Sequence, residues 1–483
     1  MPGTGGAAAY RDLGRLVRGP LLRPGDEGYD SARRVWNGAI DRRPLLIAQC
    51  ADADDVSAAV RYAVRNGIEL SVRSTGHNVT GCAISDGGLT LDLSGLRDIR
   101  IDPDRRTAVV QPGVLWGDFD AAAQEHGLAT TGGRISTTGV AGLTLGGGFG
   151  WLMRRYGLSA DNLRAVDLVT ADGRRSRVDP STDAELFWAL RGGGGNFGVA
   201  TALEFRLHPV GPMVTGGAAF YPEAEAGRVL RWYRDFLRDA PDVVSAQCNL
   251  LRLPPAPFVP AELHGRSAVA IAVCHTGTDT EAERDLAALG DLGPPLLRRI
   301  GRMRYLSLQR LYDMAGRFGS FVYGRAGYLP ALDDQAVTVL EKGAGAVPSP
   351  HCIIMISPLG GAVARVGLGD TAVGHRSAQF SISVDAVWRS PAEAPAHRDW
   401  VNGLWRGLLP STTGVYVNEL GDEGPERTRS AYEETSWARL RSVKADVDPG
   451  NVFHLNQNIP PGVTETTASA EKTPLVVTGE ADR

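Results

Sequence analysis

Two stretches of small residues constrain this chain more than any other feature of its sequence. The first, residues 72–78 (VRSTGHN), directly follows the alternating apolar run of residues 68–72, which predicts a strand. The second covers residues 137–150 (TTGVAGLTLGGGFG). Loops with so little side chain let backbone N–H groups close around phosphate groups. We therefore expect one extended ligand containing a diphosphate to lie across both loops, and His77 to meet what the phosphates carry.

The elements around the first stretch alternate between helix and strand. Residues 52–67 carry one apolar stripe at helical spacing and end at Gly67, a common helix stop. Strands are predicted at residues 68–72, 89–93 and 105–111, and a second helix at residues 116–126. This alternation predicts an α/β domain.

A third glycine-rich stretch, Gly193-Gly-Gly-Asn-Phe-Gly198, has the residues of the dinucleotide-binding pattern GxGxxG but not its structural context. The predicted helix 183–191 precedes it and the predicted strand 199–207 follows it, which reverses the order that a Rossmann unit requires. We interpret this stretch as a tight turn packed near a cofactor. A further strand is predicted at residues 163–169, and a domain boundary is expected near His208-Pro209.

The region from about residue 210 to 410 has longer strands with amphipathic helices between them. Strands are predicted at residues 268–274, 352–357 and 379–388, and a helix at residues 281–289. This pattern predicts a sheet covered by helices on one face. In the last strand Phe380, Ile382, Val384 and Ala386 would face the helices, and Ser381, Ser383, Asp385 and Val387 would face the other way. That polar face could cover a ligand held by another domain.

The bulk properties exclude several classes of protein. A chain of 483 residues is too long for one ordinary core, so two or three domains are expected. A net charge of −4 argues against nucleic acid or an anionic membrane as the main partner. No apolar run is long enough to cross a membrane and no signal peptide is evident, so a cytoplasmic enzyme is expected. We expect residues 1–30 to be irregular and residues 463–483 to form a disordered tail.

Other chemistries lack their motifs. The sequence has no GxxxxGK[ST] for a P-loop, no GxSxG for a hydrolase and no HExxH or HxH pair for zinc, so no metal site is expected. The cysteines are odd in number and lack CxxC spacing, which fits a reducing compartment without disulfides. They are Cys50, Cys82, Cys248, Cys274 and Cys352.

Taken together, the motifs resemble a known family. Residues 73–78 (RSTGHN), 137–150, 156–158 (YGL), 161–163 (DNL) and 187–198 (FWALRGGGGNFG) are similar to the FAD-linked oxidases, and more narrowly to the berberine bridge enzyme-like branch of the p-cresol methylhydroxylase/vanillyl-alcohol oxidase superfamily. The C-terminal Tyr416-Val-Asn418, residues 448–453 (DPGNVF) and residues 456–459 (NQNI) resemble the closing segment of that branch. The resemblance covers roughly residues 30–460.

The resemblance implies a mixed fold, α+β and α/β. A p-cresol methylhydroxylase-type FAD-binding domain of two α/β subdomains is expected at 31–208, and a substrate domain of antiparallel sheet covered by helices on one face at 209–410. Residues 411–462 would return to the FAD domain. Residues 1–30 would be an N-terminal extension and 463–483 a tail.

The resemblance also implies FAD as the cofactor, bonded through a ring nitrogen of His77 to the 8α carbon of the flavin. Many relatives carry a second tether, a cysteine four residues before the glycine that matches Gly139; this chain has Ile135 there, so a single link is expected. Cys82 would be a small buried residue. The expected cofactor-binding residues are Arg73, Ser74, Thr75, Gly76, His77, Asn78, Thr137, Thr138, Gly139, Gly142, Gly146, Gly147, Gly148, Asp161, Gly198, Val199, Tyr416, Asn418, Asn456 and Asn458.

The implied reaction is oxidation of a C–H bond next to an O–H or N–H, with hydride passing to flavin N5 and oxygen accepting the electrons as peroxide. Thr138, just before the matching glycine, is small enough to admit oxygen. Tyr416 is the first candidate for the base, unless it only packs or hydrogen-bonds near the flavin; Asp385 is the second and Glu419 the third. His375 and Arg376 would either line the substrate site or form a solvated strand edge.

Three hypotheses for the activity remain open from the sequence. The first is an oxidase or dehydrogenase of a small molecule, such as a sugar, an alcohol or amine, or a secondary metabolite. The second is a flavoprotein that catalyses a redox-neutral cyclisation or isomerisation. The third is a binding protein without turnover.

Overall fold

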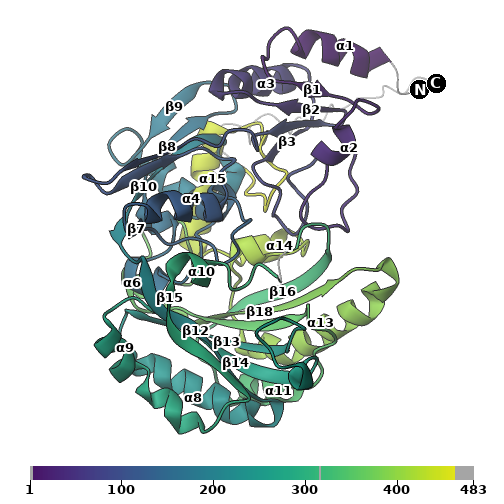
Figure 1. The fold of residues 1–483 in the computed structure, drawn as a ribbon. Coiled ribbons are helices and arrows are strands. Elements are labelled where there is room, and N and C mark those ends of the chain that lie inside the picture. The colour runs from purple at the N-terminus through teal and green to yellow at the C-terminus, as the bar shows by residue number, and fades with distance from the viewer. Residues whose placement is uncertain (1–3, 315–316, 463–483) are drawn as a thin grey trace, which may run out of the picture.

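The computed structural model describes residues 4–314 and 317–462. In Figure 1 the N-terminal part of the chain (purple to blue) forms the upper half, and the middle part (teal to green) forms the lower half. Helix α15 (Glu434–Val447, yellow) lies back among the blue strands of the upper half. The segment after the middle part therefore rejoins the first part of the chain.

The first sheet of the upper half has the order β1-β2-β4-β3, with β2 and β3 both parallel to β4. Helix α3 (Ala53–Arg65) packs its apolar stripe on this sheet. The Asp52 carboxylate accepts the N–H groups of Asp54 and Asp55, which satisfies donors that a helix start leaves unpaired. The strands are β1 (Leu21–Leu22), β2 (Leu46–Gln49), β3 (Leu70–Arg73) and β4 (Leu89–Asp92).

The prediction that residues 1–30 are irregular is wrong. Helix α1 spans Thr4–Leu13, and α2 spans Tyr29–Ala32. Ala9 and Leu13 are buried in the core of the first sheet. Glycines at the start of α1 lower its intrinsic helix propensity, but burial of its apolar side against the sheet outweighs that cost.

The second sheet of the upper half is antiparallel, with the order β5-β6-β10-β8-β9. Its core includes Trp116 of α4 and Phe205 of β10, and Leu440 of α15 packs in the same cluster. The elements are β5 (Ile99–Asp102), β6 (Thr107–Val110), α4 (Trp116–Gln124), β8 (Leu163–Val169), β9 (Arg175–Val178), α7 (Ala184–Leu190) and β10 (Val199–Arg206).

The lower half is built on one seven-stranded antiparallel sheet with the order β15-β12-β14-β13-β17-β18-β16. Helices α8 (Ala226–Asp239), α11 (Asp334–Ala344) and α13 (Ala394–Leu408) cover the face away from the upper half (Figure 1). The strands are β12 (Met213–Pro222), β13 (Val244–Arg252), β14 (Ser267–His275), β15 (Leu297–Arg304), β16 (Phe321–Leu329), β17 (Ile353–Pro358) and β18 (Phe380–Trp388).

Strand β18 has the two faces that its alternation predicts. Phe380, Ile382, Val384 and Ala386 are buried in the cluster formed with the three helices. Their neighbours Ser383, Asp385 and Val387 line a cavity on the opposite face. The middle part of the chain is therefore an antiparallel sheet with helices on one face, as expected.

A segment of the upper half covers the edge strand β16. Gly38 N–H donates to Ser320 O (2.8 Å) and Gly319 N–H to Trp36 O (2.9 Å). The Asn37 side chain donates to Val322 O (3.3 Å) and accepts Val322 N–H (3.2 Å). Residues 36–38 thus cover the start of this edge, whereas β15 at the other edge carries Arg298, Arg299, Arg302 and Arg304.

Short elements complete the fold. The helix expected at residues 281–289 is α9 (Asp279–Asp285), after which the chain continues as a 3-10 turn. In the described ranges, none of the helices has the length and hydropathy to cross a membrane. The tail expected at residues 463–483 lies outside the described residues. The remaining elements are β7 (Leu128–Ala129), α5 (Val140–Leu145), α6 (Met153–Tyr156), β11 (His208–Pro209), α10 (Tyr305–Gln309), α12 (Ala362–Arg365) and α14 (Pro425–Arg429).

Candidate active site

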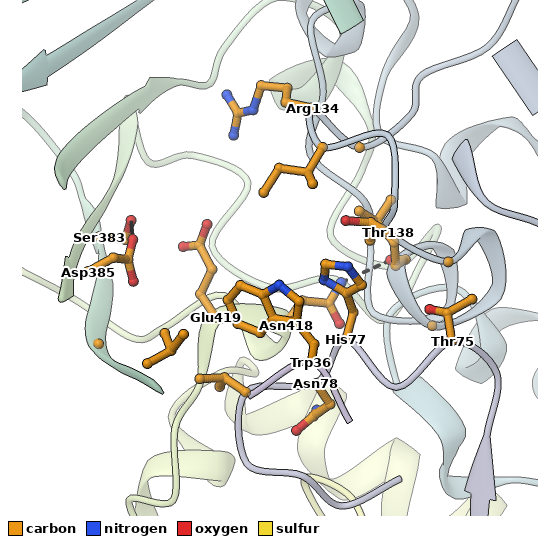
Figure 2. A pocket seen from close by; sticks show the side chains of 18 of the residues that line it. Trp36, Thr75, His77, Asn78, Arg134, Thr138, Ser383, Asp385, Asn418 and Glu419 are labelled. Atoms are coloured by element: carbon orange, nitrogen blue, oxygen red, sulfur yellow. Dashed lines mark hydrogen bonds between the residues drawn. The ribbon is translucent and has the colours of Figure 1, made fainter. Parts of the chain in front are cut away.

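A cavity of about 400 Å³ lies between the loops of the upper half and the face of the seven-stranded sheet opposite α8, α11 and α13. One wall consists of residues 74–79, 133–135 and 138–143; the other carries side chains of β17 and β18. Figure 2 shows His77 and Thr138 on one side of the hollow and Ser383 and Asp385 on the other. Both small-residue stretches therefore meet one cavity, which is what a ligand lying across them requires.

The first wall needs its small residues. Gly76 has φ +76°, a left-handed conformation that side chains other than glycine rarely adopt. A Cβ on Gly139 would lie 2.5 Å from Thr75 Oγ1, which is too close for any real contact. A Cβ on Gly142 would meet no protein atom within 4 Å, so this glycine faces open space. Backbone rather than side chain forms this surface, as a closely bound phosphate group needs.

His77 is held by two neighbours. Its Nε2 lies 3.1 Å from Thr137 Oγ1, and its ring stacks on Trp36 with centroids 5.1 Å apart. Burial lowers the pKa of His77 to about 4, so the ring is neutral at physiological pH. Within the part of the chain that is described, Nδ1 has no hydrogen-bond partner. The ring is therefore neutral beside the cavity, and Nδ1 carries a free lone pair when Nε2 donates its proton to Thr137 Oγ1.

About half of the expected cofactor-binding residues line this cavity. They are Ser74, Thr75, Gly76, His77, Asn78, Thr138, Gly139, Gly142, Tyr416 and Asn418. The others lie outside its lining: Arg73, Thr137, Gly146, Gly147, Gly148, Asp161, Gly198, Val199, Asn456 and Asn458. Thr137 still contacts His77, and Gly148 contacts Tyr416, so both support the wall from behind.

His375 and Arg376 do not line the cavity, and they do not form a solvated strand edge either. His375 Nε2 lies 2.9 Å from Ser430 O, and its ring packs against Tyr328. Arg376 is 2% exposed and forms a two-pronged ion pair with Asp161, at 2.6 and 3.1 Å. This buried pair joins residues distant in sequence and leaves Asp161 engaged with arginine.

Tyr416 lies at the cavity with its hydroxyl fully engaged. The phenol oxygen accepts Gly148 N–H (2.7 Å) and Asn418 Nδ2 (2.7 Å), and the ring stacks on Phe149 at 3.8 Å between centroids. Burial raises the pKa of Tyr416 above its usual value, so the phenol is protonated at neutral pH. Asn418 also donates to Leu143 O (2.9 Å), which fixes this corner to the first wall.

Two carboxyl groups face the hollow, Asp385 from strand β18 and Glu419 from the 3-10 turn Val417–Glu419. Asp385 accepts a hydrogen bond from Ser383 Oγ (2.6 Å), and burial raises its pKa to about 6. Burial raises the pKa of Glu419 to about 7, and the negative charge of Asp385 adds to this effect. The positive charge of Arg134 acts in the opposite direction. In Figure 2 the Glu419 carboxylate points into the space between Asp385 and Arg134. Both groups titrate near neutral pH, where a general base works best.

The structure also brings in residues that the sequence did not single out. Trp36, Arg134, Tyr312 and His351 all line the cavity from loops or short turns. A signal existed for one of them, since Arg134 directly precedes Ile135, the position of the second tether in many relatives. Ile135 itself lines the cavity.

Cys82 lies outside the lining of the cavity. Its Sγ contacts Thr80 Oγ1 at 2.7 Å, and burial raises the pKa of the thiol. A thiol held protonated in this way is a weak nucleophile. Over the described residues, no three His, Cys, Asp or Glu side chains gather into a group that could hold a metal ion.

Comparison with known proteins gives concordant matches. A model described as "FAD binding domain" matches residues 44–179, and one described as "Berberine and berberine like" matches residues 415–460. The chain is 31% identical to (R)-6-hydroxynicotine oxidase of Paenarthrobacter nicotinovorans over 460 residues, which cover 92% of this chain and 97% of the relative.

Solved structures match over a similar length. The crystal structure of 6-hydroxy-D-nicotine oxidase from Arthrobacter nicotinovorans aligns with a TM-score of 0.84 at 30% identity, covering 92% of this chain and 98% of the other. Xylooligosaccharide oxidase from Myceliophthora thermophila aligns with a TM-score of 0.82 at 22% identity, covering 95% and 100%. At this identity, the likeness to xylooligosaccharide oxidase shows that the two proteins share a fold.

Proposed function

This chain belongs to the berberine bridge enzyme-like family of FAD-linked oxidases, and from that premise we propose that it holds FAD covalently through His77 and oxidises a compact small molecule with oxygen as the acceptor. It is an FAD-dependent oxidoreductase. The observation that carries the proposal is the single cavity in which the neutral His77 ring faces two carboxyl groups that titrate near pH 7.

The residues present fit a flavin dinucleotide. The open space beside Gly142 and the small residues of the loop 74–76 leave backbone free to approach a diphosphate. The loop, together with Thr138, Gly139 and Asn418, would hold the cofactor. When bound, FAD supplies a two-electron acceptor that oxygen can reoxidise.

The arrangement of His77 supports a single covalent link. Thr137 engages Nε2, so Nδ1 is the nitrogen left to form the bond to the 8α carbon. The low pKa keeps the ring neutral, and Nδ1 has the lone pair that a nucleophile needs when Nε2 donates its proton to Thr137 Oγ1. Ile135 cannot form a thioether, and Cys82 lies outside the cavity. These points favour one tether over two.

The geometry favours the carboxyl groups over Tyr416 as the base. Burial keeps the Tyr416 phenol protonated at pH 7, against the two hydrogen bonds that its oxygen accepts, so it cannot take up a further proton there, whereas Asp385 and Glu419 titrate near that pH. We assign Tyr416 a positioning role: its oxygen holds the Gly148 N–H and the Asn418 amide in the first wall. Asp385 or Glu419 would accept the substrate's O–H or N–H proton.

Two features of the cavity support a compact substrate and oxygen as the electron acceptor. Ile353, Met355 and Val387 give the sheet wall an apolar surface beside its carboxyl groups, which suits a compact, partly apolar alcohol or amine of secondary metabolism. Thr138 lines the cavity with a small side chain, which leaves oxygen a path to it. The relative named for 6-hydroxynicotine points to the same substrate size.

Acid denaturation tests the tether. Flavin absorbance should remain with the precipitated wild-type chain, and the tryptic peptide containing His77 should carry the mass of FAD. The His77→Ala variant should release its flavin, whereas the matched Cys82→Ser variant should keep it. Release of free FAD from the wild type would exclude the covalent link.

Anaerobic mixing tests the reaction, with 6-hydroxynicotine as the compact probe and xylobiose as the sugar probe. Bleaching of the flavin absorbance by the compact probe, followed by peroxide formation in air, is the expected result. Bleaching without peroxide would make the protein a dehydrogenase. Reduction by xylobiose alone would contradict the compact substrate.

A further inference from the structure

Arg134 extends from the first wall into the cavity. It follows Gly133 directly, and in Figure 2 its guanidinium points toward the space above Glu419 and opposite Asp385 and Ser383. The surrounding protein desolvates the group and lowers the pKa of Arg134, but a guanidinium stays charged in proteins. A positive charge therefore borders the space where a substrate would lie.

Two arginines that are buried show what is unusual about Arg134, which is only partly buried. Arg154 donates to the carbonyl oxygens of Val244, Leu359 and Ala240, at 2.8 to 3.0 Å. Arg376 is paired with the Asp161 carboxylate. Arg134 donates only to Ser357 Oγ, at 3.1 Å, and forms no ion pair with any described residue. Its remaining N–H donors are left for a group in the cavity.

Neighbouring side chains hold this corner in a donor arrangement. Gln247 Nε2 donates to Ser357 Oγ (3.0 Å), so this oxygen accepts two hydrogen bonds. Asn249 Nδ2 donates to the phenol oxygen of Tyr312 (2.9 Å), which leaves the Tyr312 O–H free to donate. Tyr312 lines the cavity as Arg134 does. The Arg134 guanidinium and the Tyr312 O–H therefore both offer hydrogen-bond donors to the cavity.

A buried cation costs free energy unless an anion pairs with it. The planar fork of arginine matches the two oxygens of a carboxylate. The two carboxyl groups repel such a ligand only weakly at pH 6, because burial raises the pKa of Glu419 to about 7, which keeps it mainly protonated, and that of Asp385 to about 6, which leaves it about half protonated.

We propose that Arg134, assisted by Tyr312, binds a carboxylate group of the substrate, so that the molecule oxidised here is a compact carboxylic acid whose reacting C–H bond is held toward Asp385 and Glu419. This assignment rests on the proposed oxidase function and adds a substrate class to it. Arg134 then determines specificity and leaves the proton transfer to the carboxyl groups.

Titration of the flavin-loaded protein with benzoate at pH 6 tests the assignment, with benzamide as the neutral molecule of the same shape. Benzoate should perturb the visible absorbance of the flavin and bind at least tenfold more tightly than benzamide. Arg134→Met should weaken benzoate at least tenfold and leave benzamide unchanged. Arg155→Met is the matched control, because Arg155 donates to Thr276 outside the cavity.

Two further variants keep the test decisive if Arg134→Met folds poorly. Arg134→Lys keeps the charge but loses the fork, and Tyr312→Phe removes the second donor; each should weaken benzoate severalfold. Equal affinity for benzoate and benzamide, or benzoate binding that none of these variants weakens, would overturn the carboxylate assignment. Either result would leave the covalent flavin and its reduction intact, whereas loss of flavin binding in the wild type would contradict the proposed function itself.

Discussion

The two faces of the seven-stranded sheet differ more than any other neighbouring regions of the molecule. On β18, Ile382 and Val384 are fully buried against α8, α11 and α13, while the alternate residues Ser383 and Asp385 face the cavity. The period of two along a strand is enough to separate them. One face stabilises the fold by burying apolar surface, and the other holds carboxyl groups at a cost in desolvation.

The comparison implies that stability and chemistry can be altered independently on one strand. A change on the helix side should weaken folding without touching the reaction. A change on the cavity side should stop the reaction with little loss of stability. Substitutions on the two faces should therefore show whether folding stability and reaction rate are independent.

The largest effect is expected at the cavity face. Asp385→Asn and Glu419→Gln should lower the rate of anaerobic flavin reduction by 6-hydroxynicotine, with a loss of roughly 10²- to 10⁴-fold at whichever group is the base. The thermal midpoint should stay the same or rise slightly, because each variant replaces a buried carboxyl with a neutral amide. Stopped-flow absorbance and thermal melts measure the two quantities, and near-normal rates in both variants would remove the base from this face.

The helix face should respond in the opposite sense. Ile382→Ala removes a fully buried side chain and should lower the free energy of unfolding by about 2 to 4 kcal/mol. The flavin of the remaining folded protein should be reduced at the wild-type rate. Denaturant titration and the same stopped-flow assay measure both effects. A matching loss of rate would show that the two faces are coupled.

The pH dependence should follow the cavity face. A base must be deprotonated, so the rate of flavin reduction should rise about tenfold per pH unit at low pH and level off above pH 7, since the pKa values are about 6 for Asp385 and about 7 for Glu419. Because both pKa values are raised in the folded state, the two carboxyls should also destabilise the fold as the pH rises from about 4 to 7. Asp385→Asn and Glu419→Gln should each remove part of both trends. A rate that rises only above pH 10 would indicate the buried Tyr416 phenol instead.

The smallest effect is expected at Tyr416. Tyr416→Phe keeps the ring stack on Phe149 and loses the acceptor for Gly148 and Asn418, which corresponds to about 1 kcal/mol for each hydrogen bond. Flavin reduction should slow severalfold, with the flavin still attached to the chain. A loss of more than a hundredfold would assign the base to Tyr416 rather than to the sheet.

Local pattern explains which parts of the fold could be predicted. Strand β8 matches its predicted range, and the alternation in β18 predicted both of its faces. Helix α1 could not be predicted in this way, because its glycines oppose a helix and only burial of Leu13 against a sheet formed later in the chain stabilises it.

The parts of the site that come from continuous sequence motifs could be predicted. The His77 loop and residues 138–142 line the cavity as expected. Trp36 and Tyr312 reach it from loops with no periodic signal, and only the packing of the two halves brings them there. The pairing of Asp161 with Arg376 joins positions distant in sequence, which no local pattern encodes. Which groups titrate near pH 7 depends on burial and is likewise a property of the folded chain.

The hydrogen bonds of residues 36–38 to the start of β16 bear on how the edges of the seven-stranded sheet are protected from other chains. An open sheet edge offers unpaired N–H and C=O groups to other chains and promotes aggregation. Here Asn37 and its neighbours occupy one edge, and the arginines of β15 place repelling charges along the other. Replacing the arginines of β15 should therefore promote aggregation without changing the rate of the reaction.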